Sequence, residues 1–133
     1  MPGSDDSRVE AAYQRGLQLA QDGYFFEAHE AFEEAWRGCA EPERDFFQGL
    51  VHVVVSAYQR GRGRPVAAER QRVKALRRLA AFEPAYRGLD VRTLRAALER
   101  AEADAREQLV QTVPQPGVLV EEEEQAEHDE RDA

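Results

Sequence analysis

Apolar residues recur at helical spacing in five stretches of this chain, and glycine or proline stands between each stretch and the next. Spacings of three and four residues place such side chains on one face of a helix, which is then buried against other helices. The predicted helices cover about residues 5–21, 24–37, 42–60, 65–80 and 90–109. The pattern predicts an all-α fold, a compact bundle of about five helices.

The third of these stretches, from Phe46 to Tyr58, is apolar around most of its circumference, which is typical of a central helix. Its β-branched residues, Val51 and Val53–Val55, are also common in strands. Helical spacing on both sides, and the lack of partner strands in the sequence pattern, favour a helix here.

The first two predicted helices resemble a single tetratricopeptide-type hairpin. Small and aromatic residues stand at the spacings of that repeat, namely Gly16, Gly23, Ala28, Phe32 and Ala35. No second copy follows at the 34-residue period, and a solenoid needs about three repeats. A peptide-binding groove on this hairpin, and hence a protein-interaction module with no catalytic site, is therefore one alternative function.

Charge divides the chain into three parts. Residues 1–45 carry 4 basic and 11 acidic side chains, residues 46–113 carry 13 and 7, and residues 114–133 carry 1 and 8. Prolines at 114 and 116 precede the last acidic run, which is too poor in apolar residues to fold alone. We therefore expect residues 1–113 to form a single helical domain and residues 114–133 to form an acidic, disordered tail.

Basic residues concentrate between Arg60 and Arg78, where eight of them accompany one acid, Glu69. Such a segment attracts phosphate backbones or other anions. No nucleic-acid motif and no interleaved aromatic residues accompany it, so we do not expect a nucleic-acid partner. Its charge is opposite to that of the acidic tail, which suggests that the tail folds over this segment and screens it.

The chain has one cysteine, Cys39, so it forms no internal disulfide, which fits a reducing compartment. No apolar stretch reaches the roughly 20 residues that span a bilayer, and the polar first residues do not resemble a signal peptide. We expect a cytoplasmic protein with no membrane partner. Association with a protein partner or a second copy through an apolar helix face stays open.

Four polar residues recur at one-turn spacing on the second and third predicted helices. His29 and Glu33 lie four residues apart, and so do Gln48 and His52, so each pair can meet on one face of its helix. If the two helices form an antiparallel hairpin about residues 40–41, His29 lies beside His52 and Glu33 beside Gln48.

Three interpretations of these polar residues remain open. Two imidazoles and a carboxylate suit zinc or iron, which makes His29, Glu33 and His52 candidate ligands of a divalent metal. A carboxylate can instead tune an imidazole for acid–base work, but complete metal and catalytic motifs are missing from the sequence, so we assign no catalytic residue. The third interpretation is structural: His29 is buried and bonded, and it sets how two helices pack.

Three runs in this chain resemble the family called domain of unknown function 309, over about residues 20–100. They are Tyr24…His29-Glu30…Glu33…Trp36, then Gln48-Gly49-Leu50-Val51, then Pro84…Gly88-Leu89-Asp90…Leu94. The resemblance implies a compact α-helical fold and no known activity, and the family's usual pattern has glutamine where this chain has His52. The residues that match motif positions are our candidate ligand-binding site: His29, Glu30, Glu33, Trp36, Gln48 and Gly49. We expect a binding protein whose polar pocket, between the second and third helices, takes a metal ion or a small polar ligand.

Overall fold

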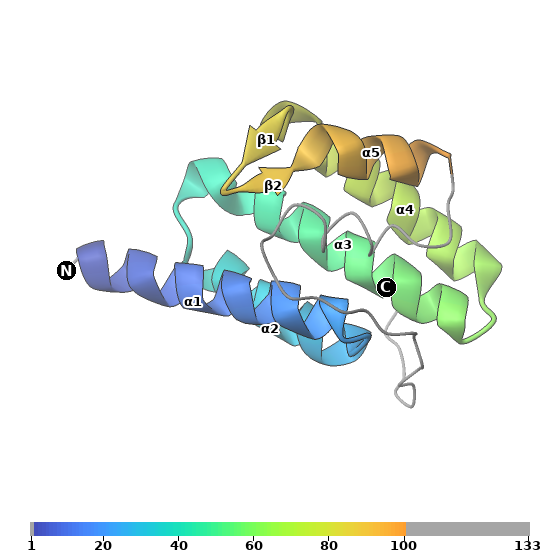
Figure 1. Cartoon of the computed structure of the whole chain (residues 1–133), viewed down its shortest axis with the longest axis horizontal. Helices are drawn as coiled ribbons and strands as arrows, with labels where there is room; N and C mark the ends of the chain where they lie inside the picture. Colours follow the sequence, from blue (N-terminus) through green and yellow to red (C-terminus); the bar gives the residue numbers. More distant parts are fainter. Residues whose placement is uncertain (1, 101–133) are drawn as a thin grey trace.

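The computed structural model describes residues 2–100, with side chains from residue 5 onward, and these residues form an all-α bundle (Figure 1). The α-helices are α1 (Pro2–Gln21), α2 (Phe25–Gly38), α3 (Arg44–Gly61), α4 (Pro65–Leu79) and α5 (Val91–Glu99). Single 3₁₀ turns precede α3 and follow α4 (Glu41–Glu43 and Ala80–Phe82), and two short strands precede α5 (β1, Ala85–Tyr86; β2, Leu89–Asp90). The predicted five-helix bundle is confirmed, whereas the predicted end of the fifth helix and the acidic tail lie outside the described residues.

Helix α3 lies between α2 and α4, and α1 and α5 pack against the outer helices (Figure 1). The valines that also suited a strand lie in α3, and Val51, Val53 and Val54 are buried there. Aromatic and aliphatic side chains from all five helices and from β2 form one continuous core. None of the described helices combines the length and the apolar composition needed to cross a membrane.

Two glycines allow neighbouring helices to approach closely. A Cβ at Gly16 of α1 would lie within 3.0 Å of three carbons of the Phe32 ring of α2, which is fully buried. A Cβ at Gly49 of α3 would lie 2.6 Å from Cγ and Cδ2 of Leu79 on α4. Both close contacts are possible only because glycine has no side chain. The distances between α1 and α2 and between α3 and α4 therefore depend on these two glycines.

The β1–β2 hairpin was not predicted from the sequence. Its strands pair antiparallel, with Ala85 opposite Asp90 and Tyr86 opposite Leu89. The two turn residues, Arg87 and Gly88, both have positive φ, 48° and 78°, as a two-residue turn of this hand requires. Asp90 then caps α5, because its carboxylate accepts from the Thr93 amide at 2.9 Å and from the Thr93 hydroxyl at 2.7 Å. These bonds hold the pKa of Asp90 below its usual value.

Arg87 fastens this hairpin to the beginning of the chain. Its guanidinium donates to both carboxylate oxygens of Glu43, at 2.7 and 3.1 Å, and also to Glu10 and Asp6 of α1. Its backbone carbonyl accepts from the Tyr13 hydroxyl at 2.9 Å. The fork-shaped contact with Glu43 is mostly shielded from water, since each of the two side chains is only 15% exposed. We name Arg87 and its partners Glu43, Glu10 and Asp6 the Arg87 clamp.

Candidate functional site

The candidate site lies along the contact between α2 and α3, which run antiparallel. Near one end the guanidinium of Arg44 stacks on the Trp36 ring, 4.2 Å from its centroid. Near the other end the rings of Phe26 and Tyr58 lie 6.1 Å apart. These two contacts set the register, so the residues between them lie at the levels that the hairpin interpretation predicted.

His29 and Glu33 meet on α2, as their spacing predicted. The Nε2 atom of His29 lies 3.2 Å from Oε2 of Glu33, and the two side chains are 12% and 40% exposed. The imidazole also packs against the Phe26 ring, at a centroid distance of 5.6 Å. Its Nδ1 atom is buried and has no hydrogen-bond partner among the described residues. The pair therefore joins a buried ring to a carboxylate that solvent can reach.

On α3, Gln48 lies one turn from Arg44, the residue that contacts Trp36. Both side chains are half-buried, as is Trp36 across the contact. We call this row of polar and aromatic residues the α2–α3 seam. It consists of His29, Glu33, Trp36, Arg44 and Gln48. Arg44 was missed from the sequence, although its level opposite Trp36 follows from the same antiparallel hairpin.

His52 does not join the seam. Its Nδ1 atom lies 2.7 Å from Oε1 of Gln71 on α4, and four residues further along α3 the Ser56 hydroxyl donates to the Ala68 carbonyl of α4 at 2.9 Å. We expected the His52 side chain to lie beside His29, and this was wrong. The side chain of His52 points from α3 toward α4 and not toward α2. Within residues 2–100 no three His, Cys, Asp or Glu side chains gather in a way that could hold a metal ion. The candidate metal ligands His29, Glu33 and His52 are thus divided between two interfaces.

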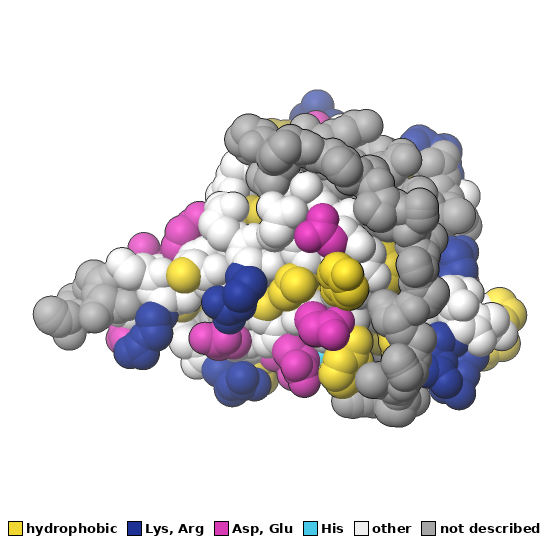
Figure 2. All heavy atoms as spheres, turned by 60° about the horizontal axis from the view of Figure 1, so that its bottom comes forward, with side chains coloured by type: hydrophobic (Ala, Val, Ile, Leu, Met, Phe, Trp, Pro, Cys, Tyr) yellow, Lys and Arg dark blue, Asp and Glu magenta, His cyan; other side chains and the backbone are white. Residues whose placement is uncertain are grey.

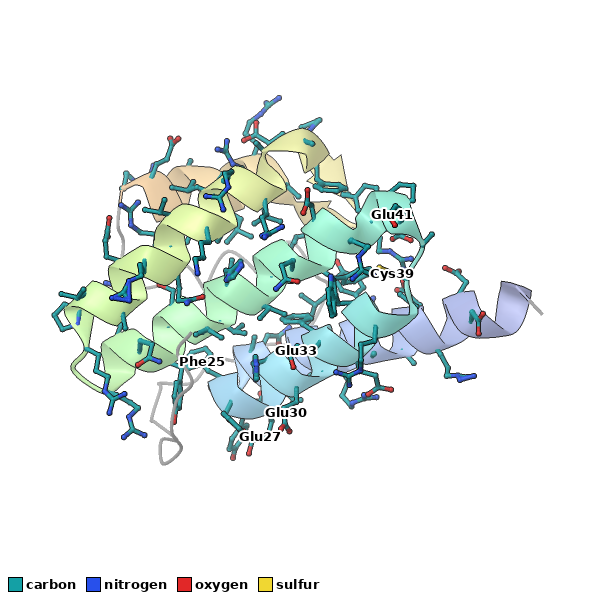
Figure 3. The ribbon with its side chains drawn as sticks, turned by 180° about the vertical axis from the view of Figure 1, so that it is seen from behind. Phe25, Glu27, Glu30, Glu33, Cys39 and Glu41 are labelled. Carbon is teal, nitrogen blue, oxygen red and sulfur yellow. The ribbon has the colours of Figure 1, made fainter. Side chains whose placement is uncertain are left out.

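The remaining candidates, Glu30 and Gly49, have other surroundings. Gly49 is buried under Leu79 and contributes to the α3–α4 contact. Glu30 is exposed and, with Glu27, lies on the outer side of α2 in Figure 3. It borders a shallow groove of about 480 Å³ between α1 and α2, which we name the α1–α2 groove: Arg15, Leu19, Glu27, Glu30, Ala31, Glu33, Glu34 and Arg37. Glu33 belongs to both the groove and the seam, and Figure 2 shows acidic, arginine and hydrophobic side chains side by side on this face.

His52 is expected to make the stability of the fold depend on pH. Burial lowers its pKa, the nearby charges of Arg78, Lys74 and Arg77 lower it further, and the Gln71 hydrogen bond only partly opposes these effects. The unfolded chain, with an ordinary histidine pKa of about 6.5, then binds the proton more readily than the folded chain. We expect the free energy of unfolding to fall as the pH drops through about 6.5, and the His52→Gln variant to lose part of this dependence. Urea unfolding of both proteins at several pH values between about 5.5 and 7.5 measures it. An unchanged slope in the variant would assign the pH dependence to other groups.

Comparison with known proteins relates part of the chain to a described family. The segment of residues 13–71, from α1 to the middle of α4, matches the family described as Domain of unknown function (DUF309). The two motif runs from Tyr24 to Val51 lie inside this segment, and the third run, from Pro84 to Leu94, lies outside it. No curated protein and no solved structure is significantly similar to the chain. The family that matches residues 13–71 is therefore the one that the motifs resemble, and the predicted resemblance is confirmed.

Proposed function

We propose that the protein binds a small polar ligand at the α2–α3 seam. The observation that carries this proposal is the state of His29: its ring is mostly buried, its Nε2 atom lies 3.2 Å from a carboxylate oxygen of Glu33, and Nδ1 has no partner among residues 2–100. Leaving a buried polar atom unpaired costs about 1–3 kcal/mol. A ligand that donates a hydrogen bond to this nitrogen would remove that cost.

The arrangement favours a ligand with hydrogen-bond donors, such as hydroxyl, amine or amide groups. Because His29 Nε2 lies near one oxygen of Glu33 and the carboxylate is 40% exposed, its other oxygen can accept a bond from a ligand. Gln48 adds an amide that both donates and accepts. Arg44, held against Trp36, adds a positive charge for an anionic group on the same ligand. No group at the seam is arranged as a nucleophile with its base, so binding is proposed rather than catalysis.

A specific observation supports the alternative, a protein-interaction module. The α1–α2 groove, of about 480 Å³, has apolar atoms of Leu19 and Ala31 within a rim of four glutamates and two arginines. It lies on the hairpin whose residues resemble a tetratricopeptide repeat, and its rim suits a basic peptide. Because Glu33 belongs to both places, experiments must separate the groove from the seam with other residues.

The first test uses Trp36, which is the only tryptophan of the chain and belongs to the seam. Pools of amino acids, nucleotides, sugar phosphates and small carboxylic acids are titrated while its fluorescence is followed. We expect one compound to change the emission saturably, and Glu33→Gln and Gln48→Ala to weaken that compound's binding about tenfold or more. Glu34→Gln is the matched control, because Glu34 is an exposed neighbour that pairs with Arg15 on α1 at 2.6 Å. If Glu34→Gln or Glu27→Gln weakens binding and Gln48→Ala does not, the ligand binds in the α1–α2 groove and not at the seam.

The second test needs no ligand. We expect His29→Leu to leave the free energy of unfolding unchanged or to raise it, because an apolar side chain of similar size removes the buried unpaired nitrogen. Glu33 keeps contact with water in this variant, so it is not left as a buried charge. A loss of more than about 1 kcal/mol in urea unfolding would show instead that His29 is a structural residue, and would contradict the proposal.

A further inference from the structure

The outer face of α4 carries a groove that the bundle does not fill. It has a volume of about 530 Å³, and its residues are Pro65, Val66, Glu69, Arg70, Val73, Lys74 and Arg77, which we name the α4 groove. Two of its apolar side chains are open to solvent, since Val66 is 69% exposed and Val73 is 45% exposed. Val66, Arg70, Val73 and Arg77 are spaced by three and four residues, so they form one continuous stripe on the helix.

The basic side chains of this groove are not neutralised by the bundle. Among the described residues, no acidic side chain forms an ion pair with Arg70, Lys74 or Arg77, whereas Glu69 is already bonded to Arg72 at 2.9 Å. Arg78 points elsewhere, to Asp45 of α3 at 2.7 Å. The groove therefore presents exposed valines beside three uncompensated cations. Its natural occupant combines apolar side chains with carboxylates.

The chain contains one segment with this composition. Val118-Leu119-Val120 is followed directly by four glutamates, Glu121–Glu124, and then by four further acidic residues before the end of the sequence. In the described bundle the last residues of α5 lie beside α4, because Arg72 of α4 donates to the carbonyl of Leu98 at 2.7 Å. The chain thus leaves the described bundle next to the helix that carries the groove.

The length of the intervening chain permits the contact. Residues 101–117 can span up to about 55 Å when extended, and the 15-residue helix α4 is only about 22 Å long. A tethered segment also acts at an effective concentration in the millimolar range, so even weak complementarity is enough to hold it. From charge, apolar match and reach together, we propose that residues 118–124 dock on the α4 groove of the same molecule, with the three aliphatic residues on Val66 and Val73 and the glutamates on Arg70, Lys74 and Arg77.

The test uses the full chain with a spin label on the segment. A nitroxide is attached through Gln125→Cys in a Cys39→Ser background, and amide signals are compared before and after reduction of the label. We expect the label to abolish the signals of Val66, Arg70 and Val73. The double substitution Arg70→Glu and Lys74→Glu should restore these signals. The control is Arg8→Glu with Arg92→Glu, which reverses two exposed charges elsewhere and should not restore them. High salt should weaken the effect, because exposed charges are screened beyond about 10 Å at 0.1 M.

Three results would overturn the proposal. One is a label that leaves the α4 signals intact. Another is broadening of these signals that persists after the Arg70→Glu and Lys74→Glu substitutions, because it would not depend on the groove charges. The third is broadening that occurs only between molecules, measured by mixing spin-labelled chains with isotope-labelled chains, because a second copy would then be the occupant. Loss of the broadening on changing Val118, Leu119 and Val120 to serine, with the glutamates kept, supports the apolar half of the contact.

Discussion

Replacing Arg87 with alanine is expected to lower the free energy of unfolding by about 3 kcal/mol, the lower end of the range for breaking a shielded ion pair. The guanidinium is 15% exposed and makes a two-pronged contact with Glu43, itself 15% exposed, so the variant leaves a shielded carboxylate without its partner. It also removes the bonds to Glu10 and Asp6 of α1. Urea unfolding followed by Trp36 fluorescence measures the loss.

The control for this prediction is Arg92→Ala, which removes an exposed arginine of α5 and should change stability by no more than about 0.5 kcal/mol. Glu43→Gln should be destabilising in the wild type and nearly neutral once Arg87 is alanine, because the two groups act as one unit. Arg87→Lys should also be clearly destabilising, since an ammonium cannot make the two-pronged contact. If the double variant lost as much unfolding free energy as the two single variants together, the interaction between Arg87 and Glu43 would contribute little to stability.

Replacing Gly16 with alanine should cost about 1–3 kcal/mol, although alanine is the better helix former by about 1 kcal/mol. The added methyl group would lie within 3.0 Å of three carbons of the Phe32 ring. This ring is fully buried, so moving it aside would disturb the side chains packed around it. Steric conflict in the α1–α2 contact therefore outweighs helix propensity. Chemical unfolding of the variant, with the helix content checked by circular dichroism, tests this balance.

A second variant shows whether the conflict is local. In a Phe32→Leu background, where the ring is absent, Gly16→Ala should be far less destabilising and can become stabilising, because only helix propensity then differs. Gly61→Ala is the matched comparison, since a Cβ at Gly61 would meet no atom within 4 Å. An equal loss from Gly16→Ala in both backgrounds would mean that Phe32 is not the cause.

The helices of the fold could be predicted from the sequence because each has an apolar stripe at a regular period and a clear end. The hairpin at residues 85–90 could not, since two strands of two residues are too short to show a period, and its turn is Arg87-Gly88 rather than the favoured Asn-Gly. The clamp was equally hidden. Arg87 bonds Glu43 and Glu10, which precede it by 44 and 77 positions in the sequence. Nothing in the sequence tells which of the many arginines faces which acidic residue.

For the candidate site, the register between α2 and α3 could be predicted, but the direction of each side chain could not. Gln48 and His52 are one turn apart on α3, and yet a four-residue step advances about 40° around a helix. Because α3 has α2 on one side and α4 on the other, that rotation is enough to direct His52 to Gln71. The pair His29–Glu33 was found because both residues belong to one helix, where spacing alone decides the contact.

The Arg87 clamp also bears on how the chain folds while it is being made. The clamp joins the first helix to a turn more than 70 residues later, and a growing polypeptide acquires its N-terminal part first. Asp6 and Glu10 must therefore remain without their cation until the ribosome has released Arg87. The helical hairpin of α1 and α2 can form early from local contacts, but the clamp can join it to the β1–β2 hairpin only after Arg87 has left the ribosome.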